Sequence, residues 1–395
     1  MTSIINNSNS NSALINTLNA SQSKMNPNIY STKKIYPAAA TCYQVTDKSS
    51  GSIAASQTIT FNLMKYGIAQ QILLCYTKEG AGGTVKSFDF LDVIDRVELL
   101  SSSKVIDTLT NRDILAQLSD LDASQYYPLS KSLVGARDAG AKHIFCLPLV
   151  FGFFKDINTN LNLQFNEPMS IRVRFGPHPS NNDGVASALT NCYLKMRYKA
   201  YNESDYSEIL TQNYSEPELS IMTTGFYDEN VAVAKILNGT NSNGVNGTPV
   251  ELKNTDCVNN FFVVVRKQNT TDHSLPLPID RVVMTASGQT IFDLSKEELY
   301  FTRLCENGFS ASGATNDEVA NVAKIQVGLW EYSGGGTQSN TMSLRELNNP
   351  IITVYFSLKA NVGADTLYDI VVCEEVVKIV GTVSSSGRTN VALTN

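Results

Sequence analysis

The sequence has few charged residues and few of the residue types from which enzyme active sites are usually built. Charged side chains make up 17% of the 395 residues, below the roughly 25% of an average soluble protein. Three histidines occur, His143, His178 and His273, without the HxxxH or HExxH spacing that predicts a zinc site. The net charge of -6 argues against a basic surface for phosphate backbones, so we expect no specific nucleic-acid binding by the folded body.

Segments for export or membrane insertion are also missing from the pattern. The longest apolar run, residues 144–154, contains Pro148 and Gly152 and is much shorter than the roughly 20 residues of a membrane helix. The first 30 residues have neither a basic start nor an apolar stretch of signal-peptide length. We therefore predict no secretory signal and no transmembrane span, and we interpret residues 1–30 as a flexible polar arm.

Paired cysteine motifs are absent as well, although the chain has seven cysteines and none forms a CxxC pair. A disulfide framework is typical of short secreted chains, whereas single cysteines within apolar runs are typical of reduced core residues. We expect reduced, buried cysteines and folding inside a cell. The cysteines are Cys42, Cys75, Cys146, Cys192, Cys257, Cys305 and Cys373.

Two segments resemble known functional motifs but lack a residue that each motif requires. GAGGTVKS, residues 80–87, has Val85 where a phosphate-binding loop needs a glycine, and GFSASG, residues 308–313, has Ser312 where a nucleophile elbow needs one. A glycosidase would need two carboxylates about 5 to 10 Å apart, which the sequence alone does not decide. We assign no catalytic, cofactor-binding or metal-binding residue and predict that the protein is not an enzyme.

The sequence does contain many short segments rich in Val, Ile, Thr, Tyr and Phe, separated by turn residues, which is the signature of β-strands. In the segment 171–175 (IRVRF), apolar and charged residues alternate, as in a strand with one buried face. Helical patterns are confined to residues 112–118 and 296–304, and Ser295 is placed to cap the second. We therefore predict an all-β protein with short helices in its loops.

An internal repeat is the most informative feature. Residues 94–115 (IDRVELLSSSKVIDTLTNRDIL) align without gaps onto residues 279–300 (IDRVVMTASGQTIFDLSKEELY), 185 positions further on. Two further blocks match in the same order. Ala141-Lys142 corresponds to Ala323-Lys324, and residues 161–164 (LNLQ) correspond to residues 342–345 (MSLR). Each half of the chain is therefore expected to contain strand, turn, strand and short helix in the same order.

The repeated strand also predicts which side chains face the core. Val97 and Leu99 share one side, because successive residues of a strand point to opposite faces. Val282 and Met284 follow the same pattern in the second copy. The arginines at 96 and 281 then lie on the other face, either in solvent or against a neighbouring subunit or sheet.

Two similar β-units in one chain resemble the double jelly-roll major capsid proteins of tailless icosahedral DNA viruses. The residues that carry the resemblance are 93–107 (VIDRVELLSSSKVID) and 143–175 (HIFCLPLVFGFFKDINTNLNLQFNEPMSIRVRF). The family includes adenovirus hexons and the capsid proteins of membrane-containing phages, virophages and large DNA viruses. The resemblance implies two tandem eight-stranded jelly rolls at 31–205 and 206–385, followed by a tail at 386–395.

The resemblance also implies a function and a set of partners. Three chains would form a pseudo-hexameric homotrimer, and these capsomers would tile an icosahedral virus shell assembled inside the host cell. Minor capsid or penton proteins and an inner membrane are further partners, contacted through the N-terminal arm. The alternative is a two-domain β-sandwich that binds carbohydrate, such as an adhesin, because sandwich folds serve both functions.

Overall fold

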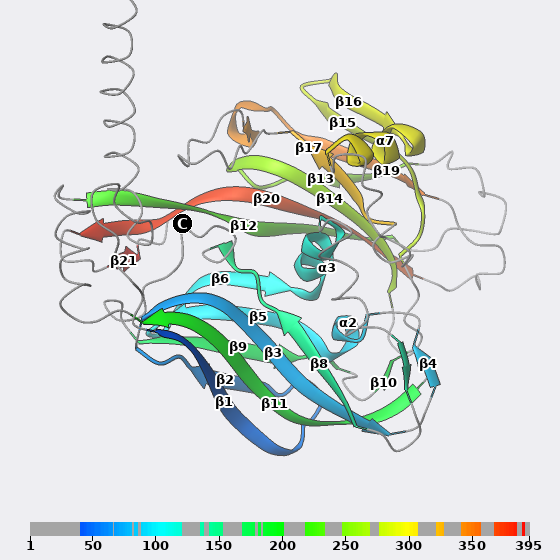
Figure 1. Cartoon of the computed structure of the whole chain (residues 1–395). Helices are drawn as coiled ribbons and strands as arrows, with labels where there is room; N and C mark the ends of the chain where they lie inside the picture. Colours follow the sequence, from blue (N-terminus) through cyan, green and yellow to red (C-terminus); the bar gives the residue numbers. More distant parts are fainter. Residues whose placement is uncertain are drawn as a thin grey trace, which may run out of the picture.

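The protein is described by a computed structural model, and strands dominate it (Figure 1). None of the described helices is long and apolar enough to cross a membrane. The expected arm at 1–30 lies outside the described residues. The structure describes residues 40–65, 67–80, 83–85, 88–120, 135–137, 142–152, 168–177, 181–182, 185–200, 218–233, 247–268, 276–306, 321–327, 341–356, 367–384 and 389–391.

The first half of the chain forms two antiparallel sheets with the strand orders β1-β11-β3-β8 and β2-β9-β5-β6. The short β10 (Asn181–Asn182) extends the first sheet by pairing with β11, and β4 (Gly83–Val85) pairs with β7 (Gly135–Arg137). The strands of the two main sheets are β1 (Ala40–Ser52), β2 (Thr58–Asn62), β3 (Ile68–Gly80), β5 (Ile94–Ser101), β6 (Lys104–Thr110), β8 (Lys142–Pro148), β9 (Met169–Phe175) and β11 (Val185–Ala200).

The second half repeats this arrangement with the orders β12-β20-β14-β17 and β13-β19-β15-β16. Two short strands, β18 (Met342–Ser343) and β21 (Thr389–Val391), add to β14 and β20, and a 3-10 turn η1 (Leu344–Glu346) follows β18. The main strands are β12 (Glu218–Val233), β13 (Thr248–Glu251), β14 (Cys257–Gln268), β15 (Ile279–Ala286), β16 (Gln289–Ser295), β17 (Ala323–Gln326), β19 (Ile351–Phe356) and β20 (Leu367–Ser384).

Both halves have the connectivity of a jelly roll. When the main strands of each half are numbered along the chain, one sheet has the order 1-8-3-6 and the other 2-7-4-5, in both halves alike. A sandwich of two such four-stranded sheets is an eight-stranded jelly roll. The prediction of an all-β protein with two tandem eight-stranded jelly rolls is confirmed.

The sequence repeat corresponds to a structural repeat. In the first copy β5, β6 and helix α3 (Asn111–Ser119) follow one another, and in the second β15, β16 and α7 (Lys296–Glu306) do so at the same spacing. Both hairpins turn at a serine with positive φ, 55° at Ser102 and 53° at Ser287. The other repeated blocks place Lys142 on β8 and Lys324 on β17, the sixth strand of each unit.

Helix α7 starts where its sequence predicts. The Ser295 hydroxyl accepts a hydrogen bond from the backbone N–H of Glu298 at 3.4 Å, and the Glu298 carboxylate accepts one from the N–H of Ser295 at 2.8 Å. Thr110 and Asp113 form the equivalent capping box on α3. Each box satisfies two backbone donors that the first turn would otherwise leave without a partner.

The predicted strand faces are confirmed. Val97 and Leu99 are fully buried, as are Val282 and Met284, and full burial of such a side chain contributes about 1.5 to 3 kcal/mol. On the opposite face, the exposed fraction of the two arginine side chains is 45% at position 96 and 49% at position 281.

The cysteines follow the prediction in part. The five whose side chains are described are free thiols, and Cys75, Cys192 and Cys373 are buried. The expectation of burial is wrong for Cys146 and Cys257, which are partly exposed, because each lies on a sheet face that the core does not cover completely. The side chains of the remaining two cysteines lie outside the described residues.

Candidate functional site

Two adjacent glutamates on β20, Glu374 and Glu375, have separate hydrogen-bond partners. On β20, Glu374 and Glu375 point to opposite faces, and each accepts a hydrogen bond from an asparagine amide, Asn254 and Asn260 respectively. Burial, reinforced by the nearby carboxylate of Glu229, raises the pKa of Glu374 to about 8. These contacts tie neighbouring segments of the second jelly roll together.

The one histidine among the described residues packs against an aromatic ring. His143 is partly buried on β8, and its ring lies 4.6 Å from that of Phe145, centroid to centroid. The other two histidines, at 178 and 273, lie outside the described residues.

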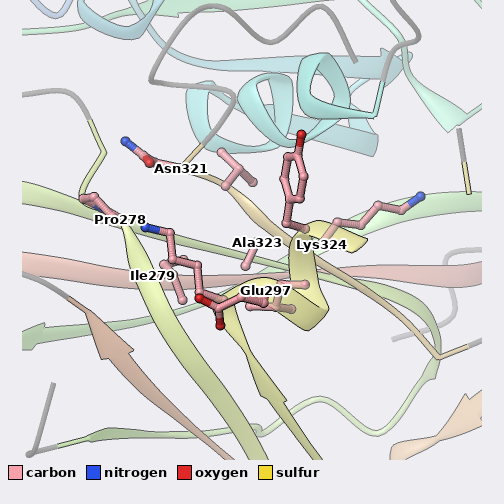
Figure 2. Close-up of a pocket in the computed structure, with 10 residues that line it drawn as sticks. Pro278, Ile279, Glu297, Asn321, Ala323 and Lys324 are labelled. Carbon is pink, nitrogen blue, oxygen red and sulfur yellow. The ribbon is translucent and has the colours of Figure 1, made fainter. Parts of the chain in front are cut away.

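A cavity of about 290 Å³ lies beside α7, between this helix, the start of β15 and the segment that leads into β17 (Figure 2). Two aromatic side chains of the same helix are directed to solvent: Tyr300 is 64% and Phe301 is 62% exposed. Single exposed apolar side chains are common, whereas neighbouring ones that form a patch can mark an interaction surface. The sequence pattern of 296–304 does not by itself indicate this surface.

The junction between the jelly rolls is built on the sheet β12-β20-β14-β17, which has a core on each side. One face packs against the second sheet of its own unit. The other face contributes Phe226, Phe262, Val264 and Val371 to the core of the first jelly roll. The rings of Phe226 and Phe262, both on this sheet, lie 6.2 Å apart. Because these four side chains belong to the same buried cluster as the core residues of the first jelly roll, the hydrophobic core continues from one unit into the other.

Helix α3 of the first jelly roll lies at this junction, between the two units (Figure 1). Its first turn is held by Arg112, whose guanidinium lies 3.5 Å from the Asp369 carboxylate on β20. Its last residues are held by Lys324 on β17, whose ammonium lies 2.6 Å from the carboxylate of Asp120. Both ends of the helix are therefore connected to the second jelly roll by opposite charges.

A cluster of polar groups lies in the centre of the junction. The Asp228 carboxylate on β12 accepts a hydrogen bond from the Thr110 hydroxyl at 3.1 Å. The Asp113 carboxyl on α3 and the Cys373 thiol on β20 lie beside it, and the interaction with Asp228 contributes to the raised pKa of both groups. The carboxyl groups of Asp113 and Asp228 and the thiol of Cys373 offer atoms that all lie within 4.8 Å of one another.

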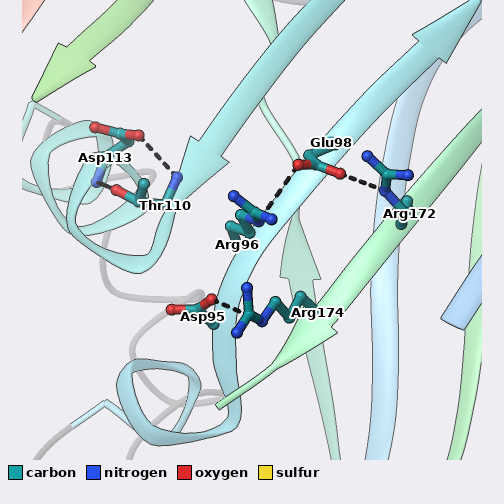
Figure 3. Close-up of polar contacts among 7 residues, drawn as sticks. All are labelled: Asp95, Arg96, Glu98, Thr110, Asp113, Arg172 and Arg174. Carbon is teal, nitrogen blue, oxygen red and sulfur yellow. Dashed lines mark hydrogen bonds and ion pairs between the residues drawn. The ribbon is translucent and has the colours of Figure 1, made fainter. Parts of the chain in front are cut away.

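The protonation of this cluster follows from its burial. Asp113 is only 2% exposed, and this burial, together with the negative charge of Asp228, raises its pKa well above the usual value. This shift favours the protonated form of Asp113, which could donate to Asp228, while Asp113 accepts the backbone N–H of Thr110 at 2.7 Å (Figure 3). Burial also raises the pKa of Cys373, which keeps its thiol protonated.

The arginines of the repeat take part in ion pairs on sheet faces that point away from the core. On the first jelly roll, the Glu98 carboxylate lies between Arg96, at 3.3 Å, and Arg172, and a second pair joins Asp95 to Arg174 (Figure 3). The equivalent arginine of the second jelly roll makes a two-pronged pair on its own sheet as well. All of these cations are partly exposed, so they remain available to solvent or to a neighbour.

Two jelly rolls of one topology in a single chain, joined by a continuous core, define a double jelly roll. Solved structures that superpose on this fold include viral capsid proteins. The PBCV-1 virus capsid protein superposes with a TM-score of 0.65 at 13% sequence identity, covering 92% of this chain and 100% of that one. The Faustovirus major capsid protein gives a TM-score of 0.61 at 10% identity, covering 89% and 92%. The mavirus major capsid protein gives 0.55 at 13% identity, covering 93% and 94%.

The resemblance seen in the sequence is thereby confirmed at the level of the fold. Neither a family model nor a curated protein matches the sequence. The likeness therefore lies in the fold, which covers nearly the whole length of these capsid proteins.

Proposed function

We propose that the protein is a major capsid protein whose homotrimeric, pseudo-hexameric capsomers tile an icosahedral virus shell. The observation that carries this proposal is the fold, which is shared over 92% of the chain with a virus capsid protein. A structural, non-enzymatic role agrees with it. The shell would be assembled inside the host cell, with jelly rolls at 31–205 and 206–385 and end segments at 1–30 and 386–395.

The internal repeat supports a ring of three chains. Three chains with two similar units each provide six similar units, and a closed ring needs a contact between each unit and the next. Within a chain, α3 of the first unit packs on the sheet β12-β20-β14-β17 of the second. The corresponding contact between chains would place α7 on the sheet β1-β11-β3-β8 of the neighbour.

Exposed apolar groups on both surfaces support this arrangement. Tyr300 and Phe301 project from α7, and Ile144, on β8, is 53% exposed on the face opposite the core. Covering the exposed parts of the two aromatic rings would remove roughly 100 to 150 Å² of surface from each, which contributes about 3 kcal/mol per residue. Buried aromatic residues of this kind commonly dominate the binding energy of an interface.

The test is the native mass of the purified protein, measured by light scattering. The wild-type chain is expected to have three times its mass of 43.1 kDa. The double variant Tyr300→Ser/Phe301→Ser should be monomeric and should still unfold cooperatively, at a lower melting temperature because it loses the stabilisation by association. Met64→Ser, which removes a side chain that is 45% exposed on the first jelly roll, is the matched control and should remain trimeric.

A wild-type chain that stays monomeric at high concentration would contradict the proposal. If that monomer bound glycans on an array, the carbohydrate-binding alternative would replace it. The further partners belong to the same proposal: neighbouring capsomers, minor capsid or penton proteins, and an inner membrane reached by the N-terminal arm. Specific nucleic-acid binding by the folded body is not expected.

A further inference from the structure

Two cysteines that are far apart in the sequence face each other across two neighbouring strands of the first jelly roll. Cys75 on β3 is paired in register with Cys146 on β8. Their sulfur atoms lie 3.2 Å apart and belong to free thiols. A disulfide bond requires about 2.05 Å between the sulfurs, so small side-chain rotations would bring the two atoms to bonding distance.

The register places this pair at the position where side chains approach most closely. The backbone N–H of Leu149 donates to the carbonyl of Ile72 at 2.9 Å, which makes these two residues a hydrogen-bonded pair. Hydrogen-bonded and non-hydrogen-bonded pairs alternate along antiparallel strands. Cys75 and Cys146 are three positions further along and therefore form a non-hydrogen-bonded pair, in which the Cα atoms are closer.

The two thiols have different reactivities. Cys146 is partly exposed, whereas Cys75 is fully buried. The hydrogen bond from Cys75 and the charge of Lys195 lower the pKa of Cys146 to about 7. The hydrogen bond to Cys146 and burial raise the pKa of Cys75. Cys146 is therefore the thiol that attacks an external disulfide, and Cys75 is placed to attack Cys146 in turn.

We propose that Cys75 and Cys146 form a reversible disulfide that links β3 to β8, with a small-molecule disulfide such as oxidised glutathione as the oxidant. The Cys146 thiolate attacks the oxidant, forming a mixed disulfide and releasing one glutathione. The sulfur of Cys75 then attacks the sulfur of Cys146, and its proton leaves with the second glutathione. The chain loses two hydrogens and two glutathione molecules are formed.

The position of the bond gives it a structural consequence. Among the described strands, β8 is the last of its sheet and pairs with β3, so the disulfide would fasten an edge strand to the sheet. It would close a loop of about 70 residues, and closing loops of this length restricts the unfolded chain strongly. The same edge strand carries the exposed Ile144, so oxidation would stabilise the surface assigned above to the neighbouring subunit.

The chain offers a direct assay, because trypsin releases each cysteine in its own peptide. Residues 66–78 contain only Cys75, and residues 143–155 contain only Cys146. The folded protein is incubated with oxidised glutathione, blocked with N-ethylmaleimide, digested and analysed by mass spectrometry. We expect a dithiothreitol-sensitive link between the two peptides and a melting temperature several degrees higher than that of the reduced chain.

The controls separate this chemistry from oligomer formation. Cys146→Ser should abolish both the link and the rise in melting temperature, whereas Cys257→Ser, which removes a partly exposed single thiol, should retain both. The experiment is run on the wild-type protein and on Tyr300→Ser/Phe301→Ser, and a link in either one supports the proposal. Cys146 that stops at the glutathione adduct in both proteins, with Cys75 free, would overturn it.

Discussion

The neutral acid at the junction makes a prediction about pH. Asp113 has a raised pKa in the folded chain because of its burial, whereas in the unfolded chain it releases its proton near its ordinary value of about 4. Between these two pKa values the folded chain binds more protons than the unfolded chain. The contribution of Asp113 to stability is therefore complete below about pH 4 and is lost as pH rises toward its folded pKa.

Asparagine imitates the neutral acid, because its amide can donate to Asp228 while its oxygen accepts the N–H of Thr110. Asp113→Asn should therefore lie within about 1 kcal/mol of the wild type at pH 5 and should lose less stability than the wild type between pH 5 and 8. Asp113→Ala removes one half of the capping box of α3, which lowers the stability by about 1 kcal/mol. It also leaves the buried polar groups around position 113 without a hydrogen-bond partner, which costs about 1 to 3 kcal/mol more. The expected loss for the alanine variant is about 2 to 4 kcal/mol.

The assay is urea unfolding of the three proteins at several pH values, with Asp95→Asn as a control that removes an exposed carboxylate of the first jelly roll. The slope of stability against pH should change in the Asp113→Asn variant and not in the control. Parallel curves for the wild type and Asp113→Asn, or equal losses for the asparagine and alanine variants, would refute the assignment of a protonated Asp113.

Three further predictions concern stability. Lys78 and Asp89 form an ion pair of 3.0 Å with no exposed side-chain surface. Lys78→Met should lower the free energy of unfolding, measured by chemical denaturation, by about 3 to 5 kcal/mol because the buried carboxylate loses its counter-charge. A loss below about 1 kcal/mol would contradict this. The pKa of Glu374 is raised to about 8, so stability should fall between about pH 5 and 8 on its account, and Glu374→Gln should flatten that part of the profile; an unchanged profile would argue against it. Gly67 has a φ of +64°, and an added Cβ would lie 2.4 Å from the carbonyl oxygen of Lys199. Gly67→Ala should therefore lower the melting temperature, because the strain costs about 1 to 3 kcal/mol. A variant as stable as the wild type would contradict this prediction.

The repeat and the strand faces could be predicted from sequence because they depend on local pattern. The IDRV segments carry the same alternation in both halves, and Ser295 precedes a helical pattern at capping distance. Topology followed from the resemblance, since the same strand pattern fits several sandwich folds.

The contacts between distant segments could not be predicted in this way. Asp113 and Asp228 meet only because α3 packs on the sheet that contains β12 and β20, and Cys75 meets Cys146 only through the register of β3 with β8. A change of register by one residue would move each side chain to the other face. The exposure of Tyr300 depends likewise on how α7 packs, because the short sequence of this helix is compatible with either a buried or an exposed aromatic residue at position 300.

The central claim, that three chains form a ring in which α7 contacts the neighbouring first jelly roll, is tested most directly by a cryo-EM map of the purified capsomer. The account predicts three chains in a six-lobed ring, with Tyr300 and Phe301 packed on the sheet β1-β11-β3-β8 of the next chain. A map that shows single chains, or a trimer in which α7 remains exposed to solvent, would contradict it.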